Sequence, residues 1–380
     1  MNKAIPEISI VVPVYNAEQY LRQCLDSALG QTLRQIECLC VDDASTDASP
    51  EILADYAAGD SRLRLITYSR NKSSSQARKD AVLASRGRYI MFLDADDYLE
   101  PSACERLLKQ IKEQDVEILQ FASEPLNIGR VSEARIENMR RYLTPASICL
   151  SGKEIVRSCF AKKKFGFTLW NKIYDAGLCR RAFAALPDGI LPAGQDLLAF
   201  FVVAFFARSY AGSTDPTIFH HYRFGSGLTG HDQITLERLE TFCTQAKVAE
   251  AVHNFIVEQD ALHEFEKENR QIRHDLFFEC FWNWRRNLSP SDREAGFELL
   301  LKYWEISDLV RVLAPADQLF DAPQDLPHYL ELPTWRDHLR LKAELADMQS
   351  SWSWRLGSAL LFLPRRLHDR LRRQGHGKRG

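Results

Sequence analysis

The first hundred residues alternate between apolar runs of strand length and segments with helical spacing, and this alternation is the strongest constraint on the fold. Strands are predicted at residues 8–14, 36–41, 63–68 and 89–93, and helices at residues 17–29, 49–58 and 75–85. Strands that are nearly all apolar are typical of a parallel sheet with helices on both faces. The sequence therefore predicts an α/β fold, in which ligands bind beyond the carboxyl ends of the strands.

The charges of the chain are balanced, because 49 Lys and Arg residues accompany 51 Asp and Glu residues and the formal net charge is −2. A chain without a global basic field is not expected to bind nucleic acid. The exception is the segment 355–380, which holds eight Lys or Arg residues and one acidic residue. We expect this segment to have a role or an environment of its own.

The sequence shows no targeting or membrane-spanning signal. Residues 1–7 lack the basic region and long apolar run of a signal peptide. The longest uninterrupted apolar run, 197–207, has 11 residues, and a membrane-spanning helix needs about 20. The nine cysteines are scattered without zinc or redox spacing, so they are expected to be reduced thiols. A cytoplasmic location is therefore expected.

Acidic residues follow two of the predicted strands. Asp42 and Asp43 end the second strand, and Asp94, Asp96 and Asp97 follow the fourth. Carboxylates crowded at the mouth of a sheet favour Mg²⁺ or Mn²⁺, held together with substrate phosphates. The alternative is a solvated turn that caps the next helix. The position directly after an apolar strand favours the metal site.

Four motifs occur in order within about ninety residues: ISIVVPVYN at 8–16, VDDASTD at 41–47, Asn71 followed by Ala77-Arg78, and GRYIMFLDADD at 87–97. In these motifs the chain resembles the family 2 glycosyltransferases, and the resemblance extends more weakly to about residue 230. It implies a GT-A Rossmann-like α/β/α sandwich, here with a C-terminal helical region and a basic amphipathic tail.

The resemblance implies a nucleotide-sugar site made of Pro13, Tyr15, Asn16, Asp43, Arg78, Asp94 and Ala95. In such a site Asp43 accepts a hydrogen bond from a uracil ring, and Arg78 lies near the diphosphate. The resemblance also implies that Asp96, together with Asp94, binds Mg²⁺ or Mn²⁺, which stabilises the charge of the leaving diphosphate.

A second predicted site lies at Ala193-Gly-Gln-Asp196, before the apolar run. By resemblance Asp196 is the general base that deprotonates the acceptor hydroxyl, and Gln195 replaces a glutamate of the family. A helix N-terminus would favour the ionised form of Asp196. The alternative is a plain helix cap. Trp170, Lys172 and Gln195 are expected on the acceptor side, although an aromatic residue is more often part of the core.

The chain departs from the family pattern at Ser73 and Lys79, where glycine and asparagine are usual. Since glycine allows positive φ, the loop 71–76 is expected to differ in shape. Together with Gln195, these departures suggest an alternative function, a catalytically weak scaffold that binds nucleotide sugars. A nucleotidyltransferase is disfavoured, because the first strand is not followed by a Gly-rich phosphate loop.

The segment His220-His-Tyr-Arg223 matches the strand that follows the base in the family, and a histidine or Arg223 is a candidate for contact with the diphosphate. Neighbouring residues of a strand point to opposite faces, so His220 and His221 are not expected to ligate one metal.

The C-terminal part is predicted to contain helices over 234–312, a Pro-containing linker at 315–333 and a tail in which Trp352, Trp354 and Phe362 precede a polybasic end. Such a tail is typical of an interfacial membrane anchor; a soluble disordered tail is the alternative. The predicted divisions are a nucleotide-sugar-binding half at 1–110, an acceptor-binding half at 111–232, a helical region at 233–333 and a helix with the basic tail at 334–380.

Together these inferences predict an inverting, metal-dependent transferase. It would move a sugar from a nucleoside diphosphate, UDP above all, to a hydroxyl of a lipid-linked or oligosaccharide acceptor. Its expected place is the inner face of the cytoplasmic membrane, as a peripheral protein in bacterial cell-surface polysaccharide synthesis.

Overall fold

The computed structural model describes residues 5–128, 131–189, 191–213, 215, 217, 219–224, 233–305, 307–308 and 312. The chain up to Val312 forms one compact unit. The predicted linker at 315–333 and the tail at 352–366 lie outside the described residues, as does the loop at 225–232. The predicted divisions of the chain stay predictions.

The described strands are β1 (Ile8–Val14), β2 (Ile36–Asp42), β3 (Leu63–Thr67), β4 (Tyr89–Phe92), β5 (Tyr98–Leu99), β6 (Ile118–Gln120), β7 (Ser123–Asn127), β8 (Cys149–Ser151), β9 (Lys172–Asp175), β10 (Ser209–Gly212) and β11 (His220–Phe224). The described α-helices are α1 (Glu18–Leu29), α2 (Ser49–Gly59), α3 (Ser74–Ala84), α4 (Ala103–Gln114), α5 (Glu133–Leu143), α6 (Glu154–Val156), α7 (Ala176–Ala184), α8 (Gln195–Phe206), α9 (Leu236–Cys243), α10 (Gln245–Glu258), α11 (Leu262–Trp282) and α12 (Arg293–Tyr303). The predicted elements of the first hundred residues agree with these bounds to within one residue at each end.

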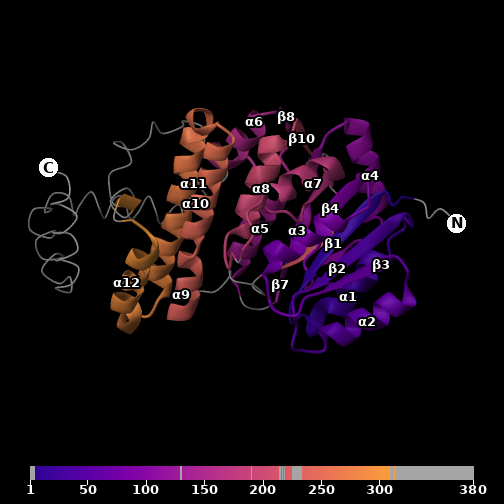
Figure 1. Cartoon of the computed structure of the whole chain (residues 1–380), viewed down its shortest axis with the longest axis horizontal. Coiled ribbons are helices and arrows are strands. Elements are labelled where there is room, and N and C mark those ends of the chain that lie inside the picture. The colour runs from indigo at the N-terminus through magenta and orange to yellow at the C-terminus, as the bar shows by residue number, and fades with distance from the viewer. Residues whose placement is uncertain are drawn as a thin grey trace, which may run out of the picture. The chain divides into compact units, whose positions relative to one another are not determined.

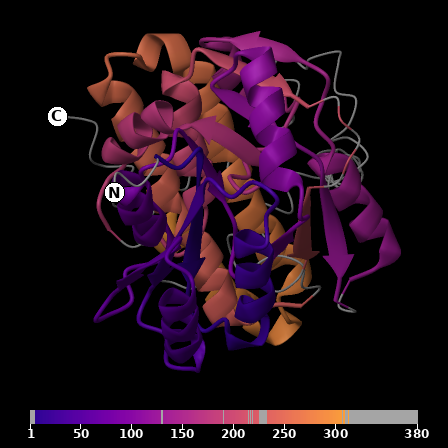
Figure 2. The same cartoon turned by 90° about the vertical axis from the view of Figure 1, so that its right-hand side faces the viewer.

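The main sheet has eight strands in the order β3-β2-β1-β4-β9-β6-β10-β8, and β5, β11 and β7 form a smaller sheet (Figures 1 and 2). Strands β1 to β4 are parallel, as predicted. Beyond β4, to which the prediction did not extend, β9 runs antiparallel to both β4 and β6. Strands β1 and β2 pair along their full length, from Ile8 opposite Ile36 to Val14 opposite Asp42. Strand β9 is short and lies between β4 and β6.

Helices cover both faces of the parallel strands. One core cluster contains alternate residues of β1 and the apolar sides of α1, α2 and α4, for example Ile10, Leu25 and Leu107. Helix α3 contacts β1 and β2 but contributes no residue to that cluster. It therefore covers the opposite face, where it packs against α7. The predicted α/β/α sandwich is confirmed in this part of the chain.

The sheet opens between the carboxyl ends of β1 and β4. Strand β4 pairs with β1 only as far as Val11, whose carbonyl accepts a hydrogen bond from the backbone N–H of Leu93. Residues two apart on a strand face the same neighbour, so Pro13 also faces the β4 side, past the last paired residue. Because proline has no N–H, no ladder hydrogen bond is lost there. This is also the point at which the chain order reverses, from β1-β2-β3 on one side to β4 on the other, and ligands bind at such points.

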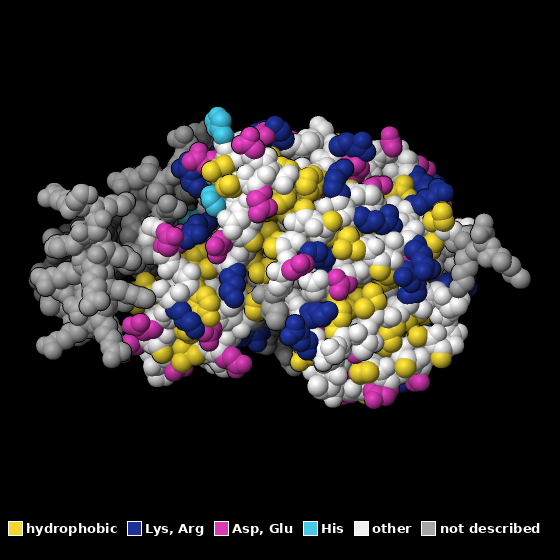
Figure 3. Space-filling model, viewed as in Figure 1, with side chains coloured by type: hydrophobic (Ala, Val, Ile, Leu, Met, Phe, Trp, Pro, Cys, Tyr) yellow, Lys and Arg dark blue, Asp and Glu magenta, His cyan; other side chains and the backbone are white. Residues whose placement is uncertain are grey.

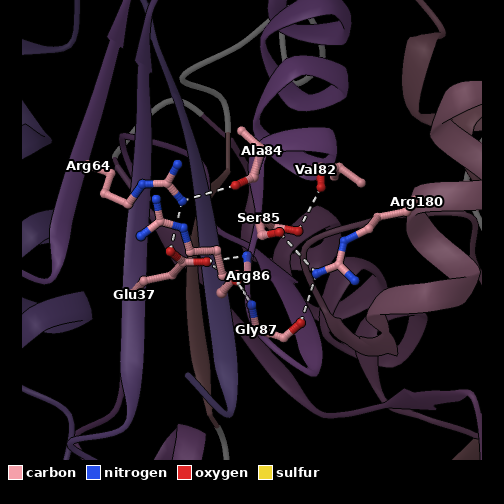
Figure 4. Close-up of polar contacts among 9 residues, drawn as sticks. Glu37, Arg64, Val82, Ala84, Ser85, Arg86, Gly87 and Arg180 are labelled. Carbon is pink, nitrogen blue, oxygen red and sulfur yellow. Dashed lines mark hydrogen bonds and ion pairs between the residues drawn. The ribbon is translucent and has the colours of Figure 1, made fainter. Parts of the chain in front are cut away.

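The amino edge of the same strands is closed by a buried carboxylate (Figure 4). Glu37 at the start of β2 is 4% exposed and accepts hydrogen bonds from Ser9 Oγ (2.6 Å), the Arg86 N–H (2.6 Å) and Arg64 Nη1 (2.9 Å). Every donor comes from a different segment, so one charge fixes the β1–β2 register and the turn that leads into β4.

Gly87 completes this edge. Its N–H donates to Ser9 Oγ at 2.9 Å, and a Cβ at this position would lie 2.6 Å from the backbone nitrogen of Ser9. The carbonyls of Ser85 and Gly87 both accept from Arg180 Nη2 at 3.0 Å (Figure 4). The close approach of Gly87 to Ser9 requires glycine at this position. It fixes where β4 begins to pair with β1, at Tyr89 opposite Ile8.

The predicted helical region is present in its described residues as α9 to α12, and α10 packs against the apolar helix α8. Within the described ranges, no helix combines the length and apolarity that crossing a membrane requires. The cysteines are free thiols, and all except Cys149 are buried. Acidic and basic side chains are interspersed over the described face seen in Figure 3.

Candidate active site

The loops that follow β1 and β2 at the carboxyl edge are joined to each other. Asn16 Oδ1 accepts from the Thr46 N–H at 2.8 Å, and Ser45 Oγ accepts from the Asn16 N–H at 3.1 Å. Asn16 and Ala44 take positive φ values of 49° and 60°. Tyr15 is 52% exposed. The loops thus place an exposed aromatic ring beside the opening of the sheet, which fits its predicted place in a nucleotide pocket.

Asp43 organises the next loop. The residue is 2% exposed, and its carboxylate accepts from the backbone N–H groups of Lys72 (2.6 Å) and Ser73 (2.9 Å). Burial raises the pKa of Asp43, and the two N–H donors oppose that rise. A carboxylate has about four acceptor positions, so a further donor such as a uracil N–H can still be accommodated. The predicted contact with uracil stays a prediction.

The same loop carries the first departure from the family pattern. Ser73 has φ 83° and ψ 154°, a backbone conformation that favours glycine. Its Oγ is buried, and none of the described residues gives it a hydrogen-bond partner. The serine therefore occupies a glycine-like conformation, which for other residues costs about 1–3 kcal/mol.

Arg78 connects the two predicted sites. Its side chain, which is 6% exposed, comes from α3 and reaches two carboxylates. Nη2 donates to Asp94 Oδ1 at 2.6 Å, and Nη1 donates to Asp196 Oδ1 at 2.9 Å. The structure thus brings together residues 16 and 118 positions away from Arg78. This link had no signal in the sequence, because spacing along a chain does not report such pairing.

Asp196 lies in the first turn of α8, and its side chain is 26% exposed. The alternative of a plain helix cap is wrong, because the N-cap is Gly194 and no side chain caps the helix. Burial raises the pKa of Asp196, which outweighs the opposing effect of Arg78, while Asp94 adds to the rise. Burial and Asp94 thus act against the ionised form, which the helix N-terminus was expected to favour.

The acidic residues of the turn after β4 differ in burial. Asp97 is fully buried; it accepts from the Arg223 N–H at 2.9 Å and lies 3.1 Å from His220 Nε2. Burial, with the neighbouring Asp94, raises its pKa. Asp97 therefore holds β11 in place. Asp94 and Asp96 are partly exposed, and Ala95 between them is 7% exposed.

Asp94 and Asp96 are the predicted ligands of Mg²⁺ or Mn²⁺. No group of three or more His, Cys, Asp or Glu residues within the described ranges is arranged to hold a metal ion. Asp94 and Asp96 offer two carboxylates at one strand end, and Mg²⁺ is commonly bound by one or two carboxylates together with substrate phosphates. The residues fit a metal that is shared with a diphosphate.

Two residues predicted on the acceptor side are enclosed. Trp170 is 5% exposed and stacks on His220 and Tyr222, with ring centroids 4.8 and 4.7 Å apart. Lys172 is fully buried, and its Nζ donates to the Thr168 carbonyl at 2.5 Å. Burial lowers the pKa of Lys172 to about 7. These contacts give both side chains a packing role behind the site, and acceptor binding by them stays a prediction.

Gln195 and Lys79, the other departures, face different ways. Gln195 Nε2 donates to Ser74 Oγ at 3.0 Å and so ties α8 to the start of α3. Lys79 Nζ donates to the Leu186 carbonyl and to Asp188, both at 2.7 Å. Only Gln195 therefore borders the loop of Ser73. Ser74 was not singled out by sequence reasoning, and no pattern marked it.

The strand at 220–224 confirms the prediction about its histidines. His220 contacts Asp97 and Trp170, whereas His221 stacks on Tyr98 at 4.4 Å and lies 2.6 Å from Glu100 Oε1. The two rings belong to different surroundings, so one metal cannot bind both. Contact of this strand with a diphosphate stays a prediction.

Residues 9–168 match the family described as Glycosyl transferase family 2. EpsH of Bacillus subtilis is 32% identical over 267 residues, which are 69% of this chain and 73% of EpsH. Chondroitin synthase of Escherichia coli is 38% identical over 155 residues, 39% of this chain but only 22% of that protein. Among solved structures, S. aureus TarS 1-349 in complex with UDP is 17% identical with a TM-score of 0.48, covering 80% of this chain and 88% of TarS 1-349.

Proposed function

The chain belongs to glycosyl transferase family 2 and has the GT-A fold of a glycosyltransferase, and on this premise we propose that it transfers a sugar from a nucleoside-diphosphate sugar, a UDP-sugar, to a hydroxyl group of a lipid-linked or oligosaccharide acceptor. One observation carries the proposal: Arg78 places Asp94, in the predicted donor site, and Asp196, the predicted base, on one guanidinium.

The donor would bind at the opening between β1 and β4. Tyr15 is exposed there and offers a ring on which a base can stack. The Asp43 carboxylate, after β2, can accept a further hydrogen bond, here from uracil. Asp94 and Asp96 would hold Mg²⁺ or Mn²⁺ together with the diphosphate. When bound, the metal supplies stabilisation of the negative charge that develops on the leaving diphosphate.

Asp196 would act on the acceptor. Its Oδ1 is held by Arg78, so Oδ2 is the oxygen that accepts the proton of the acceptor hydroxyl. The hydroxyl oxygen then forms its bond to the anomeric carbon on the side opposite the breaking bond to the diphosphate oxygen. A single displacement of this kind inverts the configuration of the anomeric carbon.

The place of the reaction is proposed from the relatives and the tail. The name of chondroitin synthase supports a role in the synthesis of a bacterial polysaccharide. The Trp352, Trp354 and Phe362 side chains and the basic end of the tail favour attachment to an anionic membrane surface. Co-sedimentation of the full chain with anionic vesicles, compared with a chain that ends at residue 350, tests this part alone.

The deciding experiment measures UDP release from a panel of UDP-sugars with Mn²⁺, with and without acceptor extracts. In the Asp196→Asn variant we expect transfer to fall by about 10²–10⁴-fold, the usual contribution of a general base, while UDP binding is retained. Asp188→Asn, which changes an 84% exposed side chain on the far side of Lys79, is the matched control and should keep full activity.

Near-normal turnover of Asp196→Asn would exclude it as the base. Binding of UDP, with no release of UDP from any of the UDP-sugars, would instead favour the scaffold protein. Gln195 and Ser73, the departures from the family pattern, are the residues that suggest it.

A further inference from the structure

Arg78 is placed where a cation is needed in the absence of a bound metal. Asp94 and Asp196 both point a carboxylate oxygen at its guanidinium, which is 6% exposed. Two carboxylates brought together repel each other unless a cation compensates them. Among the described contacts of Asp94 and Asp196, Arg78 supplies that compensation.

One N–H group of the Arg78 guanidinium is unpaired within the described part of the chain. Arg78 Nε is buried, and no described residue accepts a hydrogen bond from it. Nε and Nη2 form one edge of the planar guanidinium, and such an edge matches two oxygens of a phosphate. Nη1, on the other side, stays with Asp196. One edge of Arg78 is therefore available to a diphosphate if Nη2 leaves Asp94.

A divalent ion at Asp94 and Asp96 would cause that change. It would place two positive charges next to the buried guanidinium, and like charges repel strongly where water is scarce. The ion and Nη2 would compete for the same carboxylate. The arriving diphosphate then offers the released Nη2 and the unpaired Nε new acceptors.

We propose that Arg78 occupies the cation position of Asp94 in the donor-free protein and exchanges Asp94 for the donor diphosphate when a divalent metal binds, while it keeps Asp196 in place. Arg78 is thus a positioning residue that couples the donor site to the base. This inference rests on the proposed function in taking Asp94 and Asp96 as the metal site.

The exchange predicts effects of opposite sign in the Arg78→Met variant. Without a competitor, Asp94 should bind Mn²⁺ alone at least about fivefold more tightly than in the unchanged protein, the lower end of typical coupling between sites. Without a phosphate partner, the affinity for UDP in the presence of saturating Mn²⁺ should fall by a similar factor. Titration with MnCl₂ followed by electron paramagnetic resonance gives the first constant, and calorimetry with UDP gives the second.

Three variants control the measurement. Asp96→Asn should abolish the Mn²⁺ binding, which shows that the ion binds at the acidic turn. Arg64→Met removes a comparable arginine that pairs with Glu37 at the other edge of the sheet and should change neither constant. Arg78→Lys keeps the charge but lacks the planar fork that gives each carboxylate its own nitrogen, so its Mn²⁺ affinity should lie between those of the unchanged protein and Arg78→Met. It also carries the test if Arg78→Met does not fold.

The outcomes separate the inference from the proposed function. Unchanged or weaker Mn²⁺ binding in Arg78→Met and Arg78→Lys, with Asp96→Asn inactive in binding, overturns the exchange and leaves the metal site standing. Mn²⁺ binding that survives Asp96→Asn overturns the metal site and the exchange together. Failure of the unchanged protein to bind UDP overturns the donor class of the proposed function, and with it the phosphate half of the exchange.

Discussion

At the amino edge of β1 to β4 the buried carboxylate Glu37 receives three hydrogen bonds, and at the carboxyl edge Asp94 and Asp196 share one guanidinium. One pair of carboxyl groups shows the same contrast in pKa. Hydrogen bonds from Arg62 lower the pKa of Asp60, which precedes β3 at the amino edge, whereas burial raises the pKa of Asp196 at the other.

The backbone conformations at the two edges also differ. Asn16, Ala44 and Ser73, all in loops at the carboxyl edge, have positive φ without being glycine, whereas at the amino edge the close approach is met by Gly87. The amino edge pairs the buried Glu37 carboxylate with three donors of the fold, whereas the carboxyl edge keeps strained loops and two carboxylates that share one guanidinium. The sheet is thus stabilised at its amino edge, while the strained loops lie at the carboxyl edge, where ligands of such sheets bind. The predictions below test that division.

The largest effect on stability is expected from Glu37→Ala. Removing one partner of a buried charged network costs about 3–5 kcal/mol, because Ser9, Arg64 and the Arg86 N–H lose their acceptor. Unfolding in urea measures this loss. UDP affinity of the folded protein should be unchanged, since no carboxyl-edge residue is touched. A similar stability loss in Asp196→Asn would break the comparison, because that carboxylate would then be as important to the fold.

A second prediction concerns the enclosed cation Lys172. Its pKa of about 7 lies below the ordinary lysine value, so between the two the unfolded chain binds more protons and stability rises with pH. The stability of the unchanged protein should therefore rise by about 2.7 kcal/mol relative to that of Lys172→Met between pH 6 and pH 9. Urea unfolding of both proteins at each pH gives the difference. If the difference in unfolding free energy between the two proteins does not vary with pH, the charge of Lys172 is compensated by its surroundings, as that of Arg64 is by Glu37.

The smallest effect is expected from Ser73→Gly. Relief of the backbone strain should outweigh the entropy that glycine loses on folding and stabilise the protein by about 1 kcal/mol. The melting temperature measures it. Ser74→Gly is the matched control and should destabilise, because it removes the acceptor of Gln195. A loss of stability in Ser73→Gly would indicate that this loop is not strained.

The sequence predicted the elements of the first hundred residues because their periodicity is local. It could not predict β9, since the antiparallel pairing of Lys172–Asp175 with Tyr89–Phe92 depends on a long crossing of the chain rather than on any pattern within the strand. The helix N-terminus expected at Asp196 is present, because α8 begins at Gln195.

For the site, the sequence identified which residues matter but not how they pair. Asp97 and Asp96 are neighbours of the same type, yet Asp97 turns inward to β11. Trp170 and Lys172 were predicted beside the acceptor, and their burial depends on β11 and α8, which come later in the chain. Contacts between distant segments decide these roles, and a single sequence does not record them.

Pro13 gives the opening between β1 and β4 one further property. A strand that parts from its neighbour normally exposes an N–H that must find water or another acceptor, and here that group does not exist. If the proposed donor binds here, nucleotide and solvent can replace each other between β1 and β4 with no main-chain donor at Pro13 to be satisfied anew.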